Sequence, residues 1–149
     1  MAKKFNFRLE SVLKIRTEKV EETKNSLNVA VRNRYEKENE ILTLTGEKKH
    51  FLAEPQIVLK ASDMQATKDY MSSIDRQLEI KENEKIKLIE IEKYRLEKLN
   101  EALKEEKVIV KLKEKKLTEH QQKVNREETN FLDEVGTNQF ISKFKLNNK

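Results

Sequence analysis

An apolar residue recurs at every seventh position through the second half of the chain, without a gap. The column consists of Ile89, Leu96, Leu103, Val110, Leu117, Val124 and Phe131. A seven-residue period keeps a column of side chains on one side of an α-helix, where it can pack against a partner helix. The neighbouring column is poorer, because Leu99 is apolar whereas Glu106, Lys113, His120 and Glu127 are not. The pattern therefore predicts a long helix with one narrow apolar stripe.

The first half of the chain shows a related pattern. One column holds Leu13, Val20, Leu27 and Ile41, and the companion column holds Leu9, Ala30, Leu44 and Phe51. Arg34 interrupts the first column, while Val31, Tyr35 and Leu42 widen the stripe. This spacing predicts a second amphipathic helix whose seam is somewhat more polar.

The break between the two helices is predicted around Pro55, the only proline. The residue before a proline is pushed away from helical geometry, and Gly46 weakens the helix shortly before it. Ser62 and Gln65 have the spacing of a capping box, which marks the start of a helix, and Gly136 is expected to end that helix. The resulting bounds are about 7–52 for helix one, 53–62 for the loop, about 63–133 for helix two and 136–149 for a basic tail.

These elements predict an all-α fold, a long two-helix antiparallel coiled-coil hairpin in a single domain, residues 1–149, with helix two longer than helix one. A loop centred near residue 58 would place Leu13 near Leu103, Val20 near Leu96 and Leu27 near Ile89. In that register, helix two has no partner within the chain beyond about residue 111. The apolar column nevertheless continues there, so another molecule is expected to pack against this part of helix two.

The composition narrows the classes of function. The net charge is +5, but 27 acidic residues are mixed among 32 basic ones, and Lys greatly outnumbers Arg. Nucleic-acid binding favours a face of one sign and forked Arg contacts, so it is the weaker interpretation. No apolar run approaches a membrane span, no signal peptide is expected, and the chain has no cysteine for disulfide or thiol chemistry. A soluble, cytoplasmic protein is the prediction.

No constellation for catalysis is predicted. His50 and His120 lack a second His or Cys at ligand spacing, so no metal site is expected, and a packed or solvated helix histidine is the interpretation of His120. The glycines Gly46 and Gly136 stand alone, which excludes a phosphate-binding loop. A two-helix coil offers no concave pocket in which the pKa of a carboxylate could be tuned. We therefore expect no enzyme activity and no cofactor.

Aromatic and basic residues gather near the two termini. The aromatic members are Phe5, Phe7, Phe131, Phe140 and Phe144, and the basic members are Lys3, Lys4, Arg8, Lys143, Lys145 and Lys149. Three interpretations stay open: an aromatic plug that closes the coil, a protein-docking tip, or a contact with nucleic acid or an acidic membrane. A second candidate patch holds Tyr70, Ile74 and Leu78, with Ile86, Leu88 and Ile91 partly off the main column. It is either a wider core stripe or a docking patch.

Several blocks of the sequence resemble the flagellar export protein FliJ family. The opening FNFRLESVLKIR, residues 5–16, is followed by Glu18, Glu21 and Glu22. Later blocks are residues 95–99 (RLEKL), 101–104 (EALK), 111–116 (KLKEKK), 126–128 (REE) and 131–134 (FLDE). Together with the length and the central loop, the resemblance covers essentially the whole chain, and the opening block is its most specific part.

The resemblance implies a non-catalytic stalk of the flagellar type III export apparatus, similar to the central stalk of rotary ATP synthases. Its partners would be the hexameric export ATPase FliI, the cytoplasmic domain of the export gate FlhA, and export chaperones that it escorts. It would be cytoplasmic and peripherally associated with the inner membrane at the flagellar base, reaching the membrane only through the apparatus.

Carried onto this sequence, the resemblance implies two groups of binding residues. At the ATPase end these are Phe5, Phe7, Leu9, Leu13, Leu117, Val124 and Phe131. At the export-gate end they are Tyr70 and Ile74. Three alternatives stay open: a structural homodimeric coiled coil in which two overhangs bury each other, an injectisome-type export stalk, and a basic nucleic-acid-binding helical protein.

Overall fold

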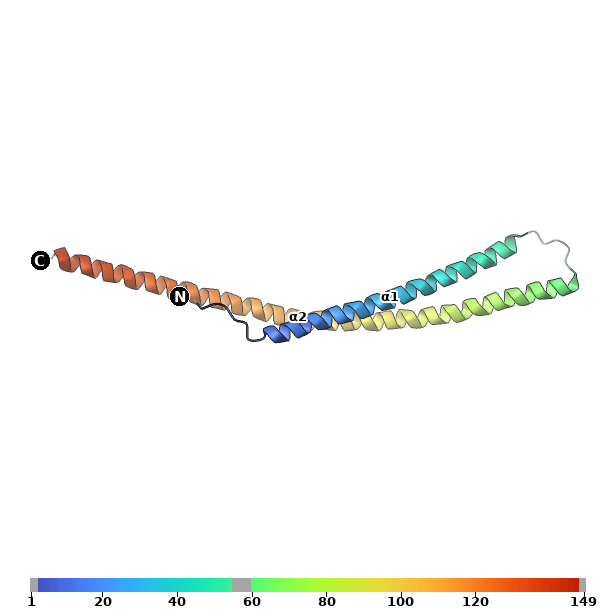
Figure 1. The fold of residues 1–149 in the computed structure, drawn as a ribbon, viewed down its shortest axis with the longest axis horizontal. Coiled ribbons are helices and arrows are strands. Elements are labelled where there is room, and N and C mark those ends of the chain that lie inside the picture. The colour runs from blue at the N-terminus through green and yellow to red at the C-terminus, as the bar shows by residue number, and fades with distance from the viewer. Residues whose placement is uncertain (1–2, 55–59, 148–149) are drawn as a thin grey trace. The chain divides into compact units, whose positions relative to one another are not determined.

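The computed structural model describes residues 3–54 and 60–147, which form two helices (Figure 1). Helix α1 spans Glu10–Ala53 and helix α2 spans Ala61–Asn147, and no strand occurs in these described ranges. The helices pack against each other in opposite directions, and α2 has 87 residues against 44 in α1. The predicted all-α fold of two packed helices, with the second longer, is confirmed.

The start of α2 differs from the prediction. The helix begins at Ala61, and the backbone carbonyl of Lys60 accepts hydrogen bonds from the amides of Asp63 (2.9 Å) and Met64 (3.0 Å). Ser62 therefore lies inside the first turn, and the prediction that it caps the helix is wrong. The predicted break at Pro55 lies outside the described residues.

The end of α2 also differs, because the helix passes through Gly136 and continues to Asn147. A single glycine costs a helix about 1 kcal/mol relative to alanine, which does not stop a long helix whose other residues are good helix formers. Its φ is not positive, so the left-handed geometry of a glycine stop is absent. The predicted non-helical tail over residues 136–147 is wrong.

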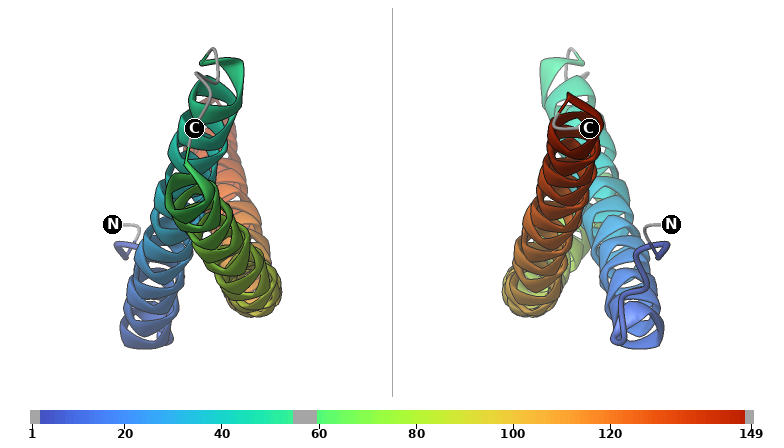
Figure 2. Two further views of the ribbon diagram at one scale, coloured as in Figure 1. Left: turned by 90° about the vertical axis from the view of Figure 1, so that its right-hand side faces the viewer. Right: turned by 90° about the vertical axis from the view of Figure 1, so that its left-hand side faces the viewer.

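The chain divides into two compact units. The helical-pair unit comprises Glu18–Leu103, and the terminal unit comprises Met1–Thr17 with Lys104–Lys149. Within the helical-pair unit, α1 and the first part of α2 run along each other (Figure 1), and the left-hand view of Figure 2 shows the same pair from the end where α1 stops and α2 begins. The expectation of one domain stays a prediction.

Helix α1 uses the predicted face in the helical-pair unit. Ala30 is 1% exposed, Leu44 is buried, and Val20, Leu27 and Ile41 are half-buried. The columns that were predicted for the first half of the chain therefore face α2.

Helix α2 packs against α1 with the predicted companion column, which contains Leu99, and with a column beside it, whereas the main predicted column does not face α1. Its buried or half-buried columns are Ile74, Lys81, Leu88, Arg95 and Ala102, and Met71, Leu78, Lys85, Glu92 and Leu99. The apolar column that starts at Ile89 lies beside this seam, and Leu96 and Leu103 are exposed. Charged residues can occupy this seam, because Lys and Arg bury their aliphatic stems and keep their charged ends in water.

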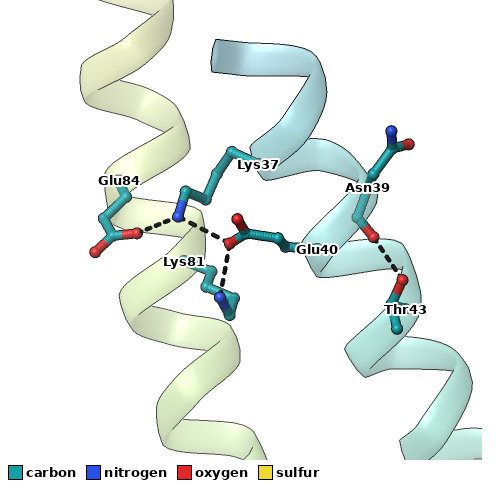
Figure 3. A network of polar contacts seen from close by, with 6 residues as sticks. All are labelled: Lys37, Asn39, Glu40, Thr43, Lys81 and Glu84. Carbon is teal, nitrogen blue, oxygen red and sulfur yellow. Dashed lines mark hydrogen bonds and ion pairs between the residues drawn. The ribbon is translucent and has the colours of Figure 1, made fainter. Parts of the chain in front are cut away.

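A polar network between the two helices shows their register (Figure 3). Lys37 Nζ lies 2.8 Å from a carboxylate oxygen of Glu84 and 2.9 Å from Glu40, and Lys81 Nζ lies 2.7 Å from the same Glu40 oxygen. Arg34 pairs with Glu92 in the same seam. Each α1 residue thus lies opposite an α2 residue about five positions beyond the predicted one, roughly 7 Å along the helix. The predicted pairs, such as Leu27 with Ile89, are wrong.

Candidate partner-binding surfaces

The segment before α1 lies along α2 in the terminal unit. The carbonyl of Phe7 accepts a hydrogen bond from the amide of Glu10 (3.1 Å), which starts the helix. Glu10 is held by Lys113, whose Nζ lies 2.8 Å from it, and Phe7 is only 7% exposed. The ring of Phe5 contacts the imidazole of His120, with 5.6 Å between ring centroids. The N-terminal segment therefore covers α2 as far as His120, further than the predicted limit near residue 111.

A groove of about 680 Å³ opens between this segment and α2 in the terminal unit. Its apolar wall includes Phe5, Phe7, Leu9 and Leu112, with His120 at one end. Its cations are Lys3, Lys4, Arg8 and Lys116, and none of the residues that line it is acidic, although Lys116 Nζ also pairs with a carboxylate oxygen of Glu119 at 2.9 Å. We call this site the basic groove. Its volume falls in the range of ligand pockets in proteins, about 300–1,000 Å³.

Beyond His120, helix α2 is uncovered. Every side chain from residue 121 to residue 147 is exposed, except for Val124 and Val135, which are half-buried. Phe131 is 63% exposed and Phe140 is 71% exposed, and the rings of Phe140 and Phe144 stack with 6.5 Å between centroids. We call residues 121–147 the α2 tip. Its length is about 40 Å at 1.5 Å per residue.

The structure separates the residues predicted for the ATPase end into two sets. Phe5, Phe7, Leu9 and Leu13 are buried or half-buried within the terminal unit. Leu117 is 38% exposed, Val124 is half-buried and Phe131 is exposed. Sequence reasoning named Phe140 and Phe144 as members of a possible docking tip but placed them in a tail, and it missed Ile141 and Leu146, which are exposed on the same helix. The spacing of Phe140, Ile141 and Phe144, which puts them on one helix face, was the available signal.

The residues predicted for the export gate also differ in accessibility. Tyr70 is 46% exposed and packs against Phe51 of α1, with 4.9 Å between ring centroids. Ile74, one turn further along α2, is only 3% exposed. At this end of the helical-pair unit, the side chain of Tyr70 is therefore accessible to a partner, whereas that of Ile74 is covered.

Electrostatic shifts are concentrated in the polar network of the helical-pair unit. Hydrogen bonds from Lys81 and then Lys37 lower the pKa of the Glu40 carboxyl to about 2. Glu84 likewise has a lowered pKa, chiefly through its hydrogen bond with Lys37. These groups are solvent-exposed ion pairs on an open helix surface, which is the pattern of a structural network.

Two searches of the described residues bear on other classes of site. Within residues 3–54 and 60–147, no group of three or more His, Cys, Asp or Glu side chains is arranged to hold a metal ion. Neither helix, over the same ranges, contains a stretch apolar enough to cross a membrane.

Two antiparallel helices, with exposed apolar side chains on the longer one, define a helical coiled-coil protein. The family model described as "Flagellar FliJ protein" matches residues 5–145, which is nearly the whole chain. The chain therefore belongs to the FliJ family and is a flagellar export-related protein associated with the flagellar export apparatus. Comparisons with curated proteins and with solved structures find no match.

Proposed function

We propose that this protein is a non-catalytic stalk of the flagellar type III export apparatus, and that its α2 tip enters the ring of the hexameric export ATPase FliI. The observation that carries the proposal is the exposed apolar surface of a single helix over residues 121–147. A single helix with side chains is about 10–12 Å across, so it suits a narrow ring opening. An asymmetric helix inside a ring makes the ATPase subunits inequivalent.

Binding of the tip to the ATPase can be measured with the purified hexamer and the full chain. A chain shortened to residues 1–134, and the double variant Phe140→Ser/Phe144→Ser, are expected to bind at least about tenfold more weakly, because each removes exposed aromatic anchors. The matched control is Leu42→Ser/Tyr94→Ser, which removes equally exposed apolar groups from the helical-pair unit. Unchanged binding by both tip variants would count against the proposal.

We also propose that the protein contacts the export gate and escorts export chaperones. The structure offers a candidate contact residue for the gate. Tyr70 is the residue available for contact with the cytoplasmic domain of FlhA, because it is half exposed and lies near the start of α2, far along the chain from the tip. Tyr70→Ala should weaken binding to that domain, whereas Tyr94→Ala, which removes another exposed tyrosine of the same unit, should not. Equal effects of the two substitutions on binding would contradict the proposal that Tyr70 contacts the gate.

Peripheral association with the inner membrane at the flagellar base would follow from these partners, with no direct membrane contact. Fractionation of cells that lack the export gate tests this part of the proposal. The protein should then leave the membrane fraction, and retention there would contradict indirect attachment.

A further inference from the structure

The α2 tip carries an acidic segment whose charge is opposite to that of the basic groove. Residues 127–134 contain four carboxylates and neither Lys nor Arg; the carboxylates belong to Glu127, Glu128, Asp133 and Glu134. The same segment contains Phe131 and Leu132, which are 63% and 66% exposed. We call residues 127–134 the acidic belt. It offers apolar anchors and negative charge, while the basic groove offers an apolar wall and four cations.

The groove and the belt lie on the same side of α2. His120 lines the groove, and Glu127 and Glu134 follow it at intervals of seven residues, so the three side chains share one helix face. Phe131 lies four residues after Glu127 and three before Glu134, next to the same face. The belt cannot reach the groove of its own chain, because both lie on one continuous helix.

The apolar column of the terminal unit has the symmetry that a pair of antiparallel helices needs. Leu117 and Phe131 are equally spaced on either side of Val124. When two α2 helices run antiparallel with a two-fold axis at Val124, Leu117 of each copy lies opposite Phe131 of the other. The groove of each copy then lies opposite the belt of the other, and the arrangement closes on itself as an isologous dimer.

We propose that the terminal unit binds a second copy of this chain, with the acidic belt of each copy docked in the basic groove of the other. The dimer goes beyond the proposed docking to the ATPase and uses the same tip, so the two contacts exclude each other. Self-association thus keeps Phe131 and Leu132 covered until the tip binds the export ATPase.

The test measures the mass of the full chain in low salt by light scattering over a range of concentrations. The chain mass is 17.7 kDa, and a dimer is expected that dissociates as salt rises, because the contact depends on exposed charges. A groove variant, Lys4→Glu/Lys116→Glu, and a belt variant, Glu127→Lys/Glu134→Lys, should each be monomeric. Either pair of reversals is expected to weaken association at least about tenfold.

Mixing the two variants gives the decisive result. In a heterodimer, the reversed groove meets the reversed belt and the unaltered groove meets the unaltered belt, so the equimolar mixture should regain the dimer mass. This rescue also shows that both variants are folded. The control Lys107→Glu/Lys111→Glu makes the same charge change on exposed residues of the terminal unit outside the groove lining, and it should stay dimeric.

Three outcomes would overturn the proposal: a wild-type chain that is monomeric at high concentration in low salt, variants that stay dimeric, or a mixture that does not regain the dimer mass. None of these measurements contains the ATPase. A failure here therefore leaves the ATPase docking standing, and a failure of ATPase binding leaves the dimer standing.

Discussion

The helical-pair unit and the terminal unit differ in how they use apolar side chains. The helical-pair unit buries Ala30, Leu44, Ile74 and Ala102 between its two helices. Among the described residues of the terminal unit, Phe7 is the one buried side chain. The apolar residues of the tip are exposed: Phe131, Leu132, Phe140, Ile141, Phe144 and Leu146. Both units expose large apolar side chains, including Leu42 and Tyr94 in the helical-pair unit, so the difference lies in what each unit buries. Because burial within the chain stabilises the fold, the comparison assigns most of the stability to the helical-pair unit, and we propose that the tip, which buries almost nothing, contacts other molecules.

The largest effect on stability should come from Ile74→Ala. Ile74 is 3% exposed, and removing a covered isoleucine side chain typically lowers the free energy of unfolding by about 2–4 kcal/mol. Phe131→Ala, in the exposed tip, should change it by less than about 0.5 kcal/mol. Urea unfolding followed by circular dichroism measures both values. Equal losses for the two variants would break the division between a stabilising unit and a binding unit.

Phe7→Ala should have the next largest effect, confined to the terminal unit. Phe7 is the most deeply buried side chain of the N-terminal segment on α2, so its loss should make local opening easier by about 2 kcal/mol, roughly thirtyfold in exchange rate. Hydrogen exchange at the amides of Glu10 and Leu13 reports that opening, since both donate hydrogen bonds to this segment. Phe144→Ala is the control and should leave these amides unchanged. No acceleration with Phe7→Ala would show that the segment is held by other contacts.

Gly136→Ala should stabilise the tip as a helix by about 0.5–1 kcal/mol. The glycine lies in α2 with a φ that is not positive, and apart from the adjoining helix backbone no atom lies within 4 Å of the position that a Cβ would take. Slower hydrogen exchange around residue 136 would support this. Faster exchange would mean that the helix requires a glycine at position 136. Gly46→Ala provides the matched change in α1, where the space is equally open.

The smallest effect should be the pH dependence carried by Glu40. Its pKa is lowered from 4.5 to about 2 in the folded chain, so its contribution to stability is fully present above about pH 4.5 and is lost as the pH falls toward 2. Glu40→Gln should therefore flatten the fall in stability between about pH 5 and pH 3, and exposure to solvent keeps the change small. Urea midpoints at the two pH values test this. Glu36→Gln, which changes another exposed carboxylate of α1, should keep the wild-type slope.

The sequence predicted the two columns of α1 that face α2, but the expected widening of the stripe by Tyr35 and Leu42 is wrong, because both side chains are exposed. On α2 two faces competed, and apolarity favoured the column of Ile89 and Leu96. The columns that face α1 include the charged residues Lys81, Glu92 and Arg95, which are half-buried through contacts with the other helix. Such contacts depend on the register, and a helical period carries no information about the register.

The candidate sites were predictable to a similar degree. The expectation that α2 is longer than α1 and keeps an apolar column required only the predicted helix lengths and the seven-residue period. The greater length of α2 is confirmed. The burial of Phe7 against α2, and the helical state of Phe140 and Phe144, were not predictable. The first depends on a non-helical segment folding onto a distant part of the chain. The second depends on how little one glycine costs a long helix.

We propose that the α2 tip is free in the isolated, dilute chain and binds inside the export ATPase. Hydrogen exchange over residues 121–147 can be measured at high dilution with and without the ATPase hexamer. We expect fast exchange in the free chain and strong protection of this segment on addition of the hexamer, with residues 84–103 unchanged. Protection of the tip in the free, dilute chain, or no change on addition of the hexamer, would contradict it.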